Sequence, residues 1–238
     1  MITTNFLRGR RRRELSQHEK AVLEASVSEV RRLPRRTTIV RQGQPVENST
    51  LLLEGVMLRY MDDREGHRQV VAIHIAGDFV DLHGYPLAWL DHDVATASAC
   101  RVALVPHRNL EAITHQEPHL ARLLWFSTLL DAAMHREWIF RIGRLGAAGR
   151  IAHLFCELNV RLGAIGLSNG RSYRLALTQI DLGEACGLTS IHVNRTLRVL
   201  REDGLVTFEK GQVTIQDWDR LRRLAEFDPA YLYLSDAA

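Results

Sequence analysis

Six side chains in one short stretch of the chain have the types and spacing of a surface that reads nucleic acid. At a helical period they face outward together, and they are Ser190, Ile191, His192, Asn194, Arg195 and Arg198. The inward positions of the same stretch are taken by Val193 and Leu197. Arg195 is the strongest candidate for reading a base, because a guanidinium can donate to both O6 and N7 of guanine in the major groove. Ser190 and His192 lie at the start of the stretch, where a recognition helix reaches base edges or a phosphate.

The segment from Thr178 to Leu200, TQIDLGEACGLTSIHVNRTLRVL, is the element that would position these side chains. Apolar residues recur through it at helical spacing, at Ile180, Leu182, Ala185, Val193, Leu197 and Leu200. Gly183 lies where two crossing helices would touch, and Gly187 lies at the turn, where glycine accepts a positive φ. Thr189 can cap the second helix, and we place Thr178 and Thr189 with the DNA-contacting residues. This spacing predicts a helix-turn-helix.

A short hairpin is predicted directly after the two helices. Residues 205–215 read LVTFEKGQVTI, in which Val206, Phe208, Val213 and Ile215 alternate about a Lys-Gly turn. Such a hairpin forms a wing beside a helix-turn-helix. A helix-turn-helix with a wing is typical of a DNA-binding domain.

Residues 37–105 have a different pattern, because short apolar runs alternate there with turns. The turns fall at Gly43, Gly55, Gly66 and Gly77, at intervals of roughly ten residues. Evenly spaced short strands with glycine turns predict a sandwich or barrel. Before this region, residues 16–30 show a helical period, and Ser16 with Glu19 predicts a capping box at its start. The fold class that follows is α+β.

A long helix is predicted from Pro118 to Arg144, because no further proline or glycine interrupts it before Gly143. One seam of this helix has spacings of three and four residues, and it consists of Leu120, Leu123, Ser127, Leu130, Met134, Glu137 and Arg141. We expect the seam to pack on a two-fold related copy as a coiled coil; burial of the helix within one domain is the alternative. The glycines at positions 143, 146 and 149 predict a hinge.

The order of these elements resembles the cyclic-AMP receptor protein and fumarate-nitrate regulator (CRP/FNR) family. The resemblance is carried by Gly43, Leu53 with Gly55, the turn at Gly66, Gly77-Asp78-Phe79, and the run AAGRIAHLFCELNVRLG. It covers nearly the entire chain and implies three parts. These are an N-terminal cyclic-nucleotide-binding-like β-roll, or jelly roll, with flanking helices (residues 1–116), a dimerisation helix with a hinge (117–145), and a winged helix-turn-helix (146–238).

The resemblance argues against the two best-known effectors of that family. Its cyclic-AMP-binding members hold the ribose with a glutamate and the cyclic phosphate with an arginine and a serine. Alignment on Gly77 puts Leu82 at the glutamate position and Asp93 with Val94 near the arginine-serine pair, where a carboxylate would repel phosphate. The iron–sulfur members use a cysteine cluster near the N-terminus. This chain has three cysteines and none before Cys100, too few for four thiolates.

Haem is the cofactor that the resemblance leaves open, because some members bind it in the β-roll through histidine or cysteine. The candidate ligands there are His67, His74, His83, His92 and Cys100, at irregular spacings more typical of structural residues. Pro118 interrupts the helix face that His115 and His119 would share, and His153 with Cys156 lacks further ligands, so we predict no metal site. Cys186 is expected to be a buried core residue. The alternative is oxidation, which would disturb the recognition helix.

The recognition stretch also departs from the family. Its best-known members have a glutamate at the position of Ile191 and a serine or glycine at that of Asn194, while their arginine matches Arg195. A glutamate accepts from cytosine N4; isoleucine cannot do so, but it could touch a thymine methyl. The run His-Val-Asn-Arg at 192–195 looks like a subset of the family whose effectors vary.

Composition favours a nucleic-acid-binding protein, and the absence of catalytic motifs argues against an enzyme. The net charge of +3 and the pI near 9.0 agree with a polyanionic partner. The absence of a signal peptide, together with few cysteines, predicts a cytoplasmic chain with no membrane partner. No glycine-rich phosphate loop, nucleophile elbow or HExxH motif indicates an enzyme.

We therefore predict a homodimeric transcription regulator that reads a palindromic operator in double-stranded DNA and contacts RNA polymerase. An unidentified signal at the β-roll would control it. The alternatives are a haem- or redox-responsive member of the same family, or a ligand-binding signalling module in which the helix-turn-helix is only a scaffold.

Overall fold

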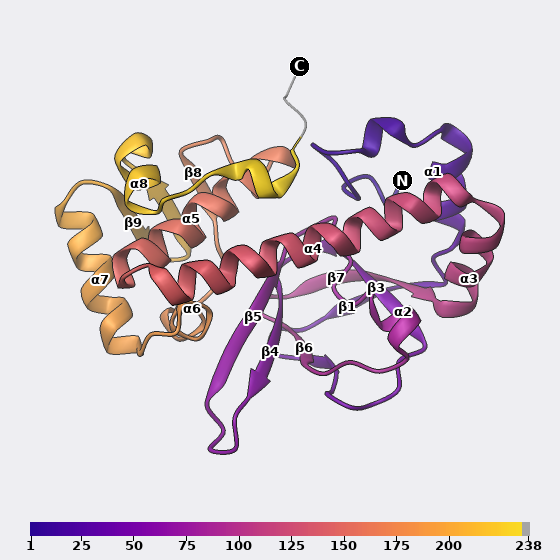
Figure 1. Cartoon of the computed structure of the whole chain (residues 1–238), viewed down its shortest axis with the longest axis horizontal. Coiled ribbons are helices and arrows are strands. Elements are labelled where there is room, and N and C mark those ends of the chain that lie inside the picture. Colours follow the sequence, from indigo (N-terminus) through magenta and orange to yellow (C-terminus); the bar gives the residue numbers. More distant parts are fainter. Residues whose placement is uncertain (235–238) are drawn as a thin grey trace. The chain divides into compact units, whose positions relative to one another are not determined.

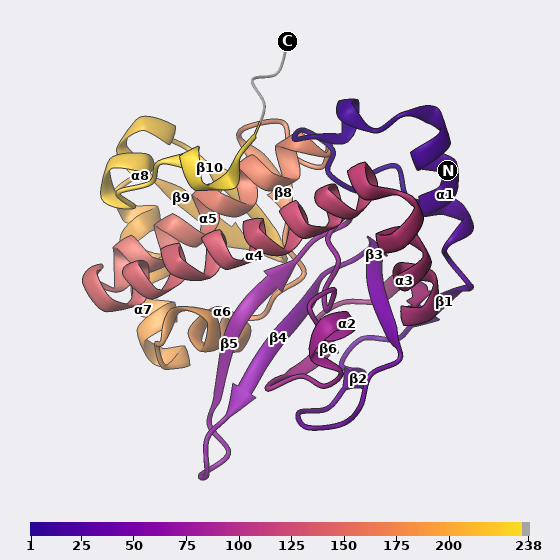
Figure 2. The same ribbon diagram turned by 45° about the vertical axis from the view of Figure 1, so that its right-hand side comes forward.

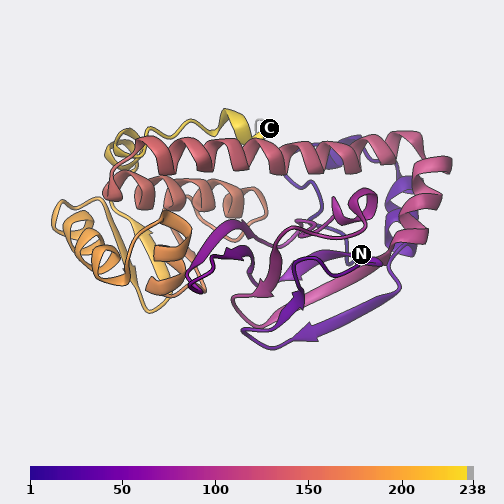
Figure 3. The same ribbon diagram turned by 60° about the horizontal axis from the view of Figure 1, so that its bottom comes forward.

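The computed structural model describes residues 1–234, which form two compact units (Figure 1). One unit consists of residues 1–61 and 72–132, and the other consists of residues 62–71 and 133–234. Helix α4 (Pro118–Arg144) is unbroken, and the division between the units falls within it, after Ala132 (Figure 3). The predicted bounds of this helix are confirmed. Among the described helices, none is both long enough and apolar enough to cross a membrane.

The first unit is built on a β-roll of two sheets (Figure 2). The strand order is β1-β7-β3 in one sheet and β2-β6-β4-β5 in the other. The strands are β1 (Glu29–Leu33), β2 (Thr38–Val40), β3 (Asn48–Glu54), β4 (Met57–Asp62), β5 (Arg68–His74), β6 (Asp93–Thr96) and β7 (Cys100–Pro106). Its helical segments, besides the first part of α4, are η1 (Arg12–Glu14), α1 (Gln17–Ala25), α2 (Gly84–Leu87) and α3 (His107–Gln116). The predicted sandwich or barrel is confirmed.

Two apolar clusters hold this unit together. One lies between the sheets and includes Leu52, Met57, Val94 and Val102, one from each of four strands. The other packs the flanking helices on the roll and includes Leu23, Leu51, Leu110 and Leu120, which are fully or almost fully buried. The inward residues of the alternating strands and the apolar stripes of the helices therefore form continuous cores, as their periods predict.

The first helix is shorter than the sequence predicts. Its capping box is confirmed, because Glu19 N donates to Ser16 Oγ at 3.1 Å and Ser16 N donates to Glu19 Oε2 at 2.8 Å. However, α1 ends at Ala25, and Glu29 and Val30, the last residues of the predicted helical stretch, belong to strand β1 instead. Antiparallel pairing with β7, which sets Val30 opposite Ala103, outweighs the local helical period there.

The second unit contains the helices and the small sheet of the C-terminal half. Its elements after α4 are α5 (Ala147–Ala164), β8 (Ser172–Arg174), α6 (Gln179–Cys186), α7 (Ser190–Glu202), β9 (Val206–Glu209), β10 (Gln212–Ile215), α8 (Trp218–Leu224) and η2 (Pro229–Leu232). The tip of the β4–β5 hairpin also belongs to this unit, and Gln69 Nε2 donates to the carbonyl of Glu184 at 2.6 Å. The last four residues of the predicted domain 146–238 lie outside the described residues.

The end of α4 belongs to the second unit, and buried polar side chains hold it there. Arg141 is fully buried and donates from Nη2 to the carbonyl of Ala185 at 2.9 Å. Its guanidinium lies 4.2 Å from the centre of the Trp138 ring. The last turns of α4 are thus fixed to α6, and Gly143, the first of the three glycines of the predicted hinge, lies within α4. The structure divides the units between Ala132 and Ala133, earlier than the expected boundary at residue 145.

Candidate nucleic-acid interface

Helices α6 and α7 are the two helices of the predicted helix-turn-helix, and a threonine caps each of them. Asp181 N donates to Thr178 Oγ1 at 3.2 Å, and Thr178 N donates to Asp181 Oδ2 at 2.7 Å. His192 N donates to Thr189 Oγ1 at 3.3 Å. These bonds satisfy backbone donors that each helix start leaves unpaired, so they determine where the first turn begins. The Thr178 hydroxyl also donates to Asp181 Oδ2 at 2.8 Å, so this hydroxyl both accepts and donates a hydrogen bond within the helix cap.

Two glycines fix how the helices cross. Gly187 ends α6 with a φ of 63°, a left-handed conformation that other residues rarely adopt. A Cβ at Gly183 would lie 2.5 Å from the Leu188 carbonyl oxygen, so only glycine fits there. Leu182 and Val193 are fully buried beside this crossing. The roles predicted for both glycines are confirmed.

The outward face of α7 is exposed as the helical period predicts. Its exposed side chains include Ser190, Ile191, His192, Asn194, Arg195 and Arg198. Ile191 is 80% exposed, the largest value among the exposed large apolar side chains of the described chain. Ile180 is a correction: we assigned it to the interior, yet it is 61% exposed. It lies in the first turn of α6, whose buried side begins at Asp181 and Leu182.

The two arginines of this face have different surroundings. The Nε of Arg198 lies 3.7 Å from Glu202 Oε1, four residues further along α7. Arg195 has no ion pair or hydrogen bond within the described residues. Its guanidinium is therefore available for an external acceptor, which suits the base-reading role predicted for it.

Gln179 is a residue of this surface that the sequence analysis missed. Its Oε1 accepts a hydrogen bond from Asn194 Nδ2 at 3.4 Å, across the crossing of the two helices. The bond constrains the rotation of the Asn194 amide. Periodicity along one helix could not reveal it, because the pair lies 15 residues apart and depends on the crossing geometry.

The wing is present, with a third strand beside it. Strands β9 and β10 pair antiparallel, and their turn has positive φ at Lys210 (49°) and Gly211 (72°). Two positive φ values in a two-residue loop are typical of a type I′ hairpin. Strand β8, which pairs with β10, was not predicted from the sequence. A strand of three residues is too short for an alternating pattern to reveal.

A buried polar network lies behind this surface, centred on Glu157 of α5. The Glu157 carboxylate is fully buried and accepts from Trp138 Nε1 at 3.0 Å, Arg161 Nη1 at 2.9 Å and Tyr231 OH at 2.9 Å. Burial by itself raises the pKa of Glu157, but the charges of Arg161 and Arg141 hold it below its ordinary value. This network joins α4, α5 and η2.

Cys186 lies in the core and is shielded from solvent. Its side chain is fully buried, and burial raises the pKa of its thiol. A thiol of this kind is the inert, protonated form, because reactive cysteines are partly exposed and have a lowered pKa. The structure therefore favours the core role over the redox role that we kept as an alternative.

The seam predicted for dimerisation is largely covered by the chain itself. Leu120, Leu123, Leu130 and Arg141 are buried, and the first two belong to the core of the first unit. Ser127, Met134 and Glu137 are half-buried. Another stripe of α4 is exposed: Trp125 is 65%, Leu129 51% and Ile139 72% exposed.

The side chains considered as haem ligands have different surroundings. His67 is exposed at the hairpin tip, where its Nδ1 lies 3.1 Å from Asp63 Oδ2. His74 and Cys100 are buried in the β-roll. The rings of His83 and His92 lie 5.3 Å apart, and burial lowers the pKa of His83 to about 3. Within the described part of the chain, no three or more His, Cys, Asp or Glu side chains form a group that could hold a metal ion.

Comparison with known proteins agrees with this architecture. A family model of the Crp-like helix-turn-helix domain matches residues 149–224, and one of the cyclic nucleotide-binding domain matches residues 30–117. The chain belongs to the CRP/FNR family of transcriptional regulators. The fumarate and nitrate reduction regulatory protein of Shigella dysenteriae is 23% identical over 214 residues, which cover 89% of this chain and 84% of that protein.

Solved structures show the same fold as this CRP/FNR regulator. FixK2 from Bradyrhizobium japonicum has a TM-score of 0.76 at 24% identity, covering 82% of this chain and 96% of FixK2. The c-di-GMP responsive regulator CLP of Xanthomonas campestris has a TM-score of 0.68 at 17% identity, covering 85% of this chain and 100% of CLP. The predicted class, a regulator with a helix-turn-helix and a cyclic-nucleotide-binding-type sensory domain, is confirmed.

Proposed function

We propose that this CRP/FNR regulator acts as a homodimer that reads a two-fold symmetric operator with the outward face of α7, under control of a signal received by the β-roll. The observation that carries the proposal is the exposed face of α7, where the Arg195 guanidinium has no internal partner within the described residues. A dimer presents two such faces, which suit half-sites about one helical turn apart.

Three side chains define the chemistry of the half-site. Arg195 donates to O6 and N7 of a guanine. Asn194 reads an adenine: Gln179 takes one hydrogen of its amide, so the second hydrogen and the carbonyl oxygen remain for N7 and the N6 amino group. Ile191, the exposed apolar residue of the face, packs against a thymine methyl. Ser190, His192 and Arg198 lie beside them and contact phosphates.

The partner subunit packs on the exposed stripe of α4. The stripe positions Trp125, Leu129, Ala132, Arg136 and Ile139 follow one another at spacings of four and three residues, the period of a coiled-coil seam. This seam replaces the one predicted from sequence, because the leucines of the latter already pack within the chain. The regulator would act in the cytoplasm with RNA polymerase, and its three buried free cysteines suit a reducing compartment.

The first test is selection of bound sequences from a random duplex pool, followed by two matched arginine variants on the selected operator. Arg195→Ala should reduce specific affinity by about 1–3 kcal/mol and relax one base position. Arg198→Ala should weaken binding to operator and to random DNA alike, because a phosphate contact carries no sequence information. An equal loss on both DNAs for Arg195→Ala would contradict the base-reading role.

The dimer is tested separately by sedimentation. Trp125→Glu places a charge in the proposed seam, whereas Leu87→Glu, at a 57% exposed position of α2, is the matched control. We expect only the first variant to sediment as a monomer and to protect a single half-site. Monomeric sedimentation of the unmodified chain on its selected operator would overturn the homodimer.

A further inference from the structure

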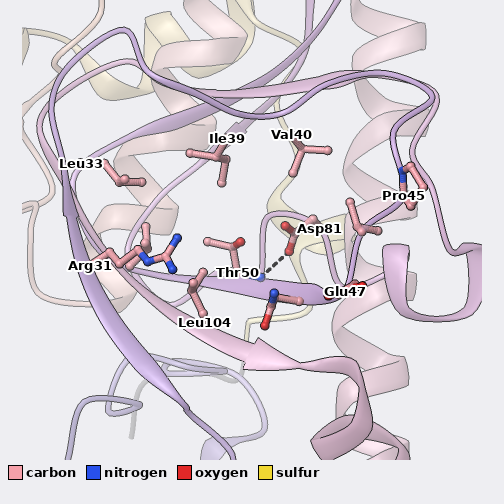
Figure 4. Close-up of a pocket in the computed structure, with 12 residues that line it drawn as sticks. Arg31, Leu33, Ile39, Val40, Pro45, Glu47, Thr50, Asp81 and Leu104 are labelled. Atoms are coloured by element: carbon pink, nitrogen blue, oxygen red, sulfur yellow. Dashed lines mark hydrogen bonds between the residues drawn. The ribbon is translucent and has the colours of Figure 1, made fainter.

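The β-roll contains a cavity that the DNA-reading function does not use (Figure 4). Its volume is about 330 Å³, and its wall includes Leu33 of β1, Ile39 and Val40 of β2, and Leu104 of β7. None of the lining residues comes from α4, and all of them belong to the first unit. Polar and apolar residues both line this cavity, and its volume lies within the range of small-molecule sites.

One acidic side chain in the lining has an incomplete set of partners. Asp81 is 1% exposed, and its Oδ1 accepts from Thr50 N at 2.5 Å, as Figure 4 shows. Its Oδ2 is shielded from water and has no hydrogen-bond partner among the residues that the structure describes. Buried carboxylates are normally paired, because a lone one loses its hydration without compensation. Oδ2 is therefore the group of this cavity that a ligand could satisfy.

The charges around the cavity favour a cation over an anion. Arg31 is the basic residue of the lining, but Glu29 holds its guanidinium through two bonds of 2.7 Å each. The other charged residue of the lining besides Asp81 is Glu47, which is exposed. Arg59, the nearby cation behind Asp81, is engaged by Asp131 Oδ2 at 2.5 Å. Asp81 and Glu47 thus form no ion pair within the described residues, although the charge of Arg59 acts on Asp81.

We propose that this cavity binds a small organic cation, an amine with a compact apolar body whose ammonium group donates to Asp81 Oδ2. The apolar body takes the space between β2 and the sheet that contains β1 and β7, and it replaces water against Leu33, Ile39 and Leu104. The ammonium group completes the hydrogen bonding of a carboxylate that Thr50 satisfies on one side only.

The test uses three probes of similar shape on the full chain: cyclohexylmethylamine, cyclohexylmethanol and cyclohexanecarboxylate. Calorimetry at pH 7.5 should show the amine binding about tenfold or more tightly than the alcohol, as expected for a charge-assisted hydrogen bond. The carboxylate should bind most weakly. Asp81→Asn should abolish the preference for the amine and retain the alcohol.

A measurement on the unmodified chain keeps the proposal testable if the variant folds poorly. The amine should shift the methyl NMR signals of Leu33, Ile39, Val40 and Leu104 while leaving those of Leu182 and Leu200 unchanged. Equal affinities for amine and alcohol, a preference for the carboxylate, shifts confined to other methyl groups, or no binding at millimolar concentration would each overturn the proposal.

The pH dependence gives an independent check. Burial raises the pKa of Asp81 to about 6, against the bonds from Thr50 and the charge of Arg59. Of the other charged groups of the lining, Arg31 is held by Glu29 and Glu47 is exposed to solvent. Affinity for the amine should therefore fall as pH drops through about 6, while affinity for the alcohol stays constant. A flat amine profile would contradict the role of Asp81.

Discussion

Two carboxylates of this chain are buried to the same degree, yet their surroundings differ. Glu157, in the DNA-binding unit, accepts hydrogen bonds from a tryptophan, an arginine and a tyrosine. Asp81, in the β-roll, accepts from the backbone of Thr50 at Oδ1 and leaves Oδ2 without a partner in the described residues. Burial pushes both pKa values upward. That of Glu157 is nevertheless held below its ordinary value, whereas that of Asp81 rises to about 6.

The difference shows what burial means for a charge. A buried carboxylate with a complete set of donors stays ionised and cross-links the elements that supply those donors. A buried carboxylate with half a set stores an unfavourable free energy, which protonation or a ligand can release. Glu157 therefore belongs to the scaffold behind the recognition helix, while Asp81 has the features of a binding group.

The largest effect is expected from Glu157→Gln. The variant leaves Arg161 buried without its counter-ion, and breaking a buried pair in this way costs about 3–5 kcal/mol of unfolding free energy. Glu202→Gln is the matched control, because its pair with Arg198 is exposed and should change stability by less than about 1 kcal/mol. Urea unfolding with hydrogen exchange on α5 measures both. If both variants lost a similar, small amount of unfolding free energy, Glu157 would not be the stabilising buried carboxylate that its contrast with Asp81 requires.

Asp81→Asn should have a smaller effect, and one that depends on pH. A carboxyl whose pKa rises from 3.8 to about 6 on folding favours the folded state fully below pH 3.8, and that stability is lost as pH rises through 6. The shift corresponds to about 3 kcal/mol. The free energy of unfolding of the variant, relative to the unmodified chain, should therefore rise by about this amount between pH 3.5 and pH 7.5. A constant difference across that range would show that Asp81 is not perturbed.

Glu157 should have the opposite slope. Its pKa is lowered in the folded chain, so its contribution is present above the ordinary glutamate value and is lost as pH falls through the folded value. As pH falls, Asp81 thus adds to the free energy of unfolding, whereas Glu157 subtracts from it. The variants Asp81→Asn and Glu157→Gln each remove one of these two contributions.

The sequence predicted the parts of this molecule that depend on local rules. The bounds of α4, the capping box at Ser16, the turn at Gly187 and the outward face of α7 each follow from residues within a few positions of one another. Pairings between distant residues had no local signal. The first two residues of strand β1, Glu29 and Val30, were predicted as helix because the partner strand β7 lies some seventy positions later in the chain.

The candidate sites follow the same division. Arg195, Asn194 and Ile191 were found from helical period and side-chain chemistry, whereas Gln179 required the crossing of two helices. Asp81 was passed over because a lone aspartate after a Gly-Asp-Phe turn carries no motif. The seam predicted for dimerisation contains leucines, such as Leu120, that pack inside the first unit, and spacing along one helix does not reveal such burial.

The smallest effect is expected from Tyr231→Phe, and it tests whether Glu157 depends on its full set of donors. The variant removes the hydroxyl that donates to Glu157 Oε2 at 2.9 Å and lies 3.2 Å from His153 Nε2. A hydrogen bond to a charged group contributes about 1.5–3 kcal/mol, and we expect the lower end here because Trp138 and Arg161 remain. Tyr85→Phe is the control, since its hydroxyl makes only an exposed contact of 3.5 Å.

The decisive measurement is a double-mutant cycle of Tyr231→Phe with Glu157→Gln. If the tyrosine acts through the carboxylate, the double variant loses less unfolding free energy than the sum of the two single variants, because Glu157→Gln has already removed the charge that strengthens this hydrogen bond. Additive losses would mean that Tyr231 stabilises η2 by packing alone. In that case the hydrogen bond from Tyr231 would not stabilise the Glu157 carboxylate. The difference between Glu157 and Asp81 would then depend on the bonds from Arg161 and Trp138 alone.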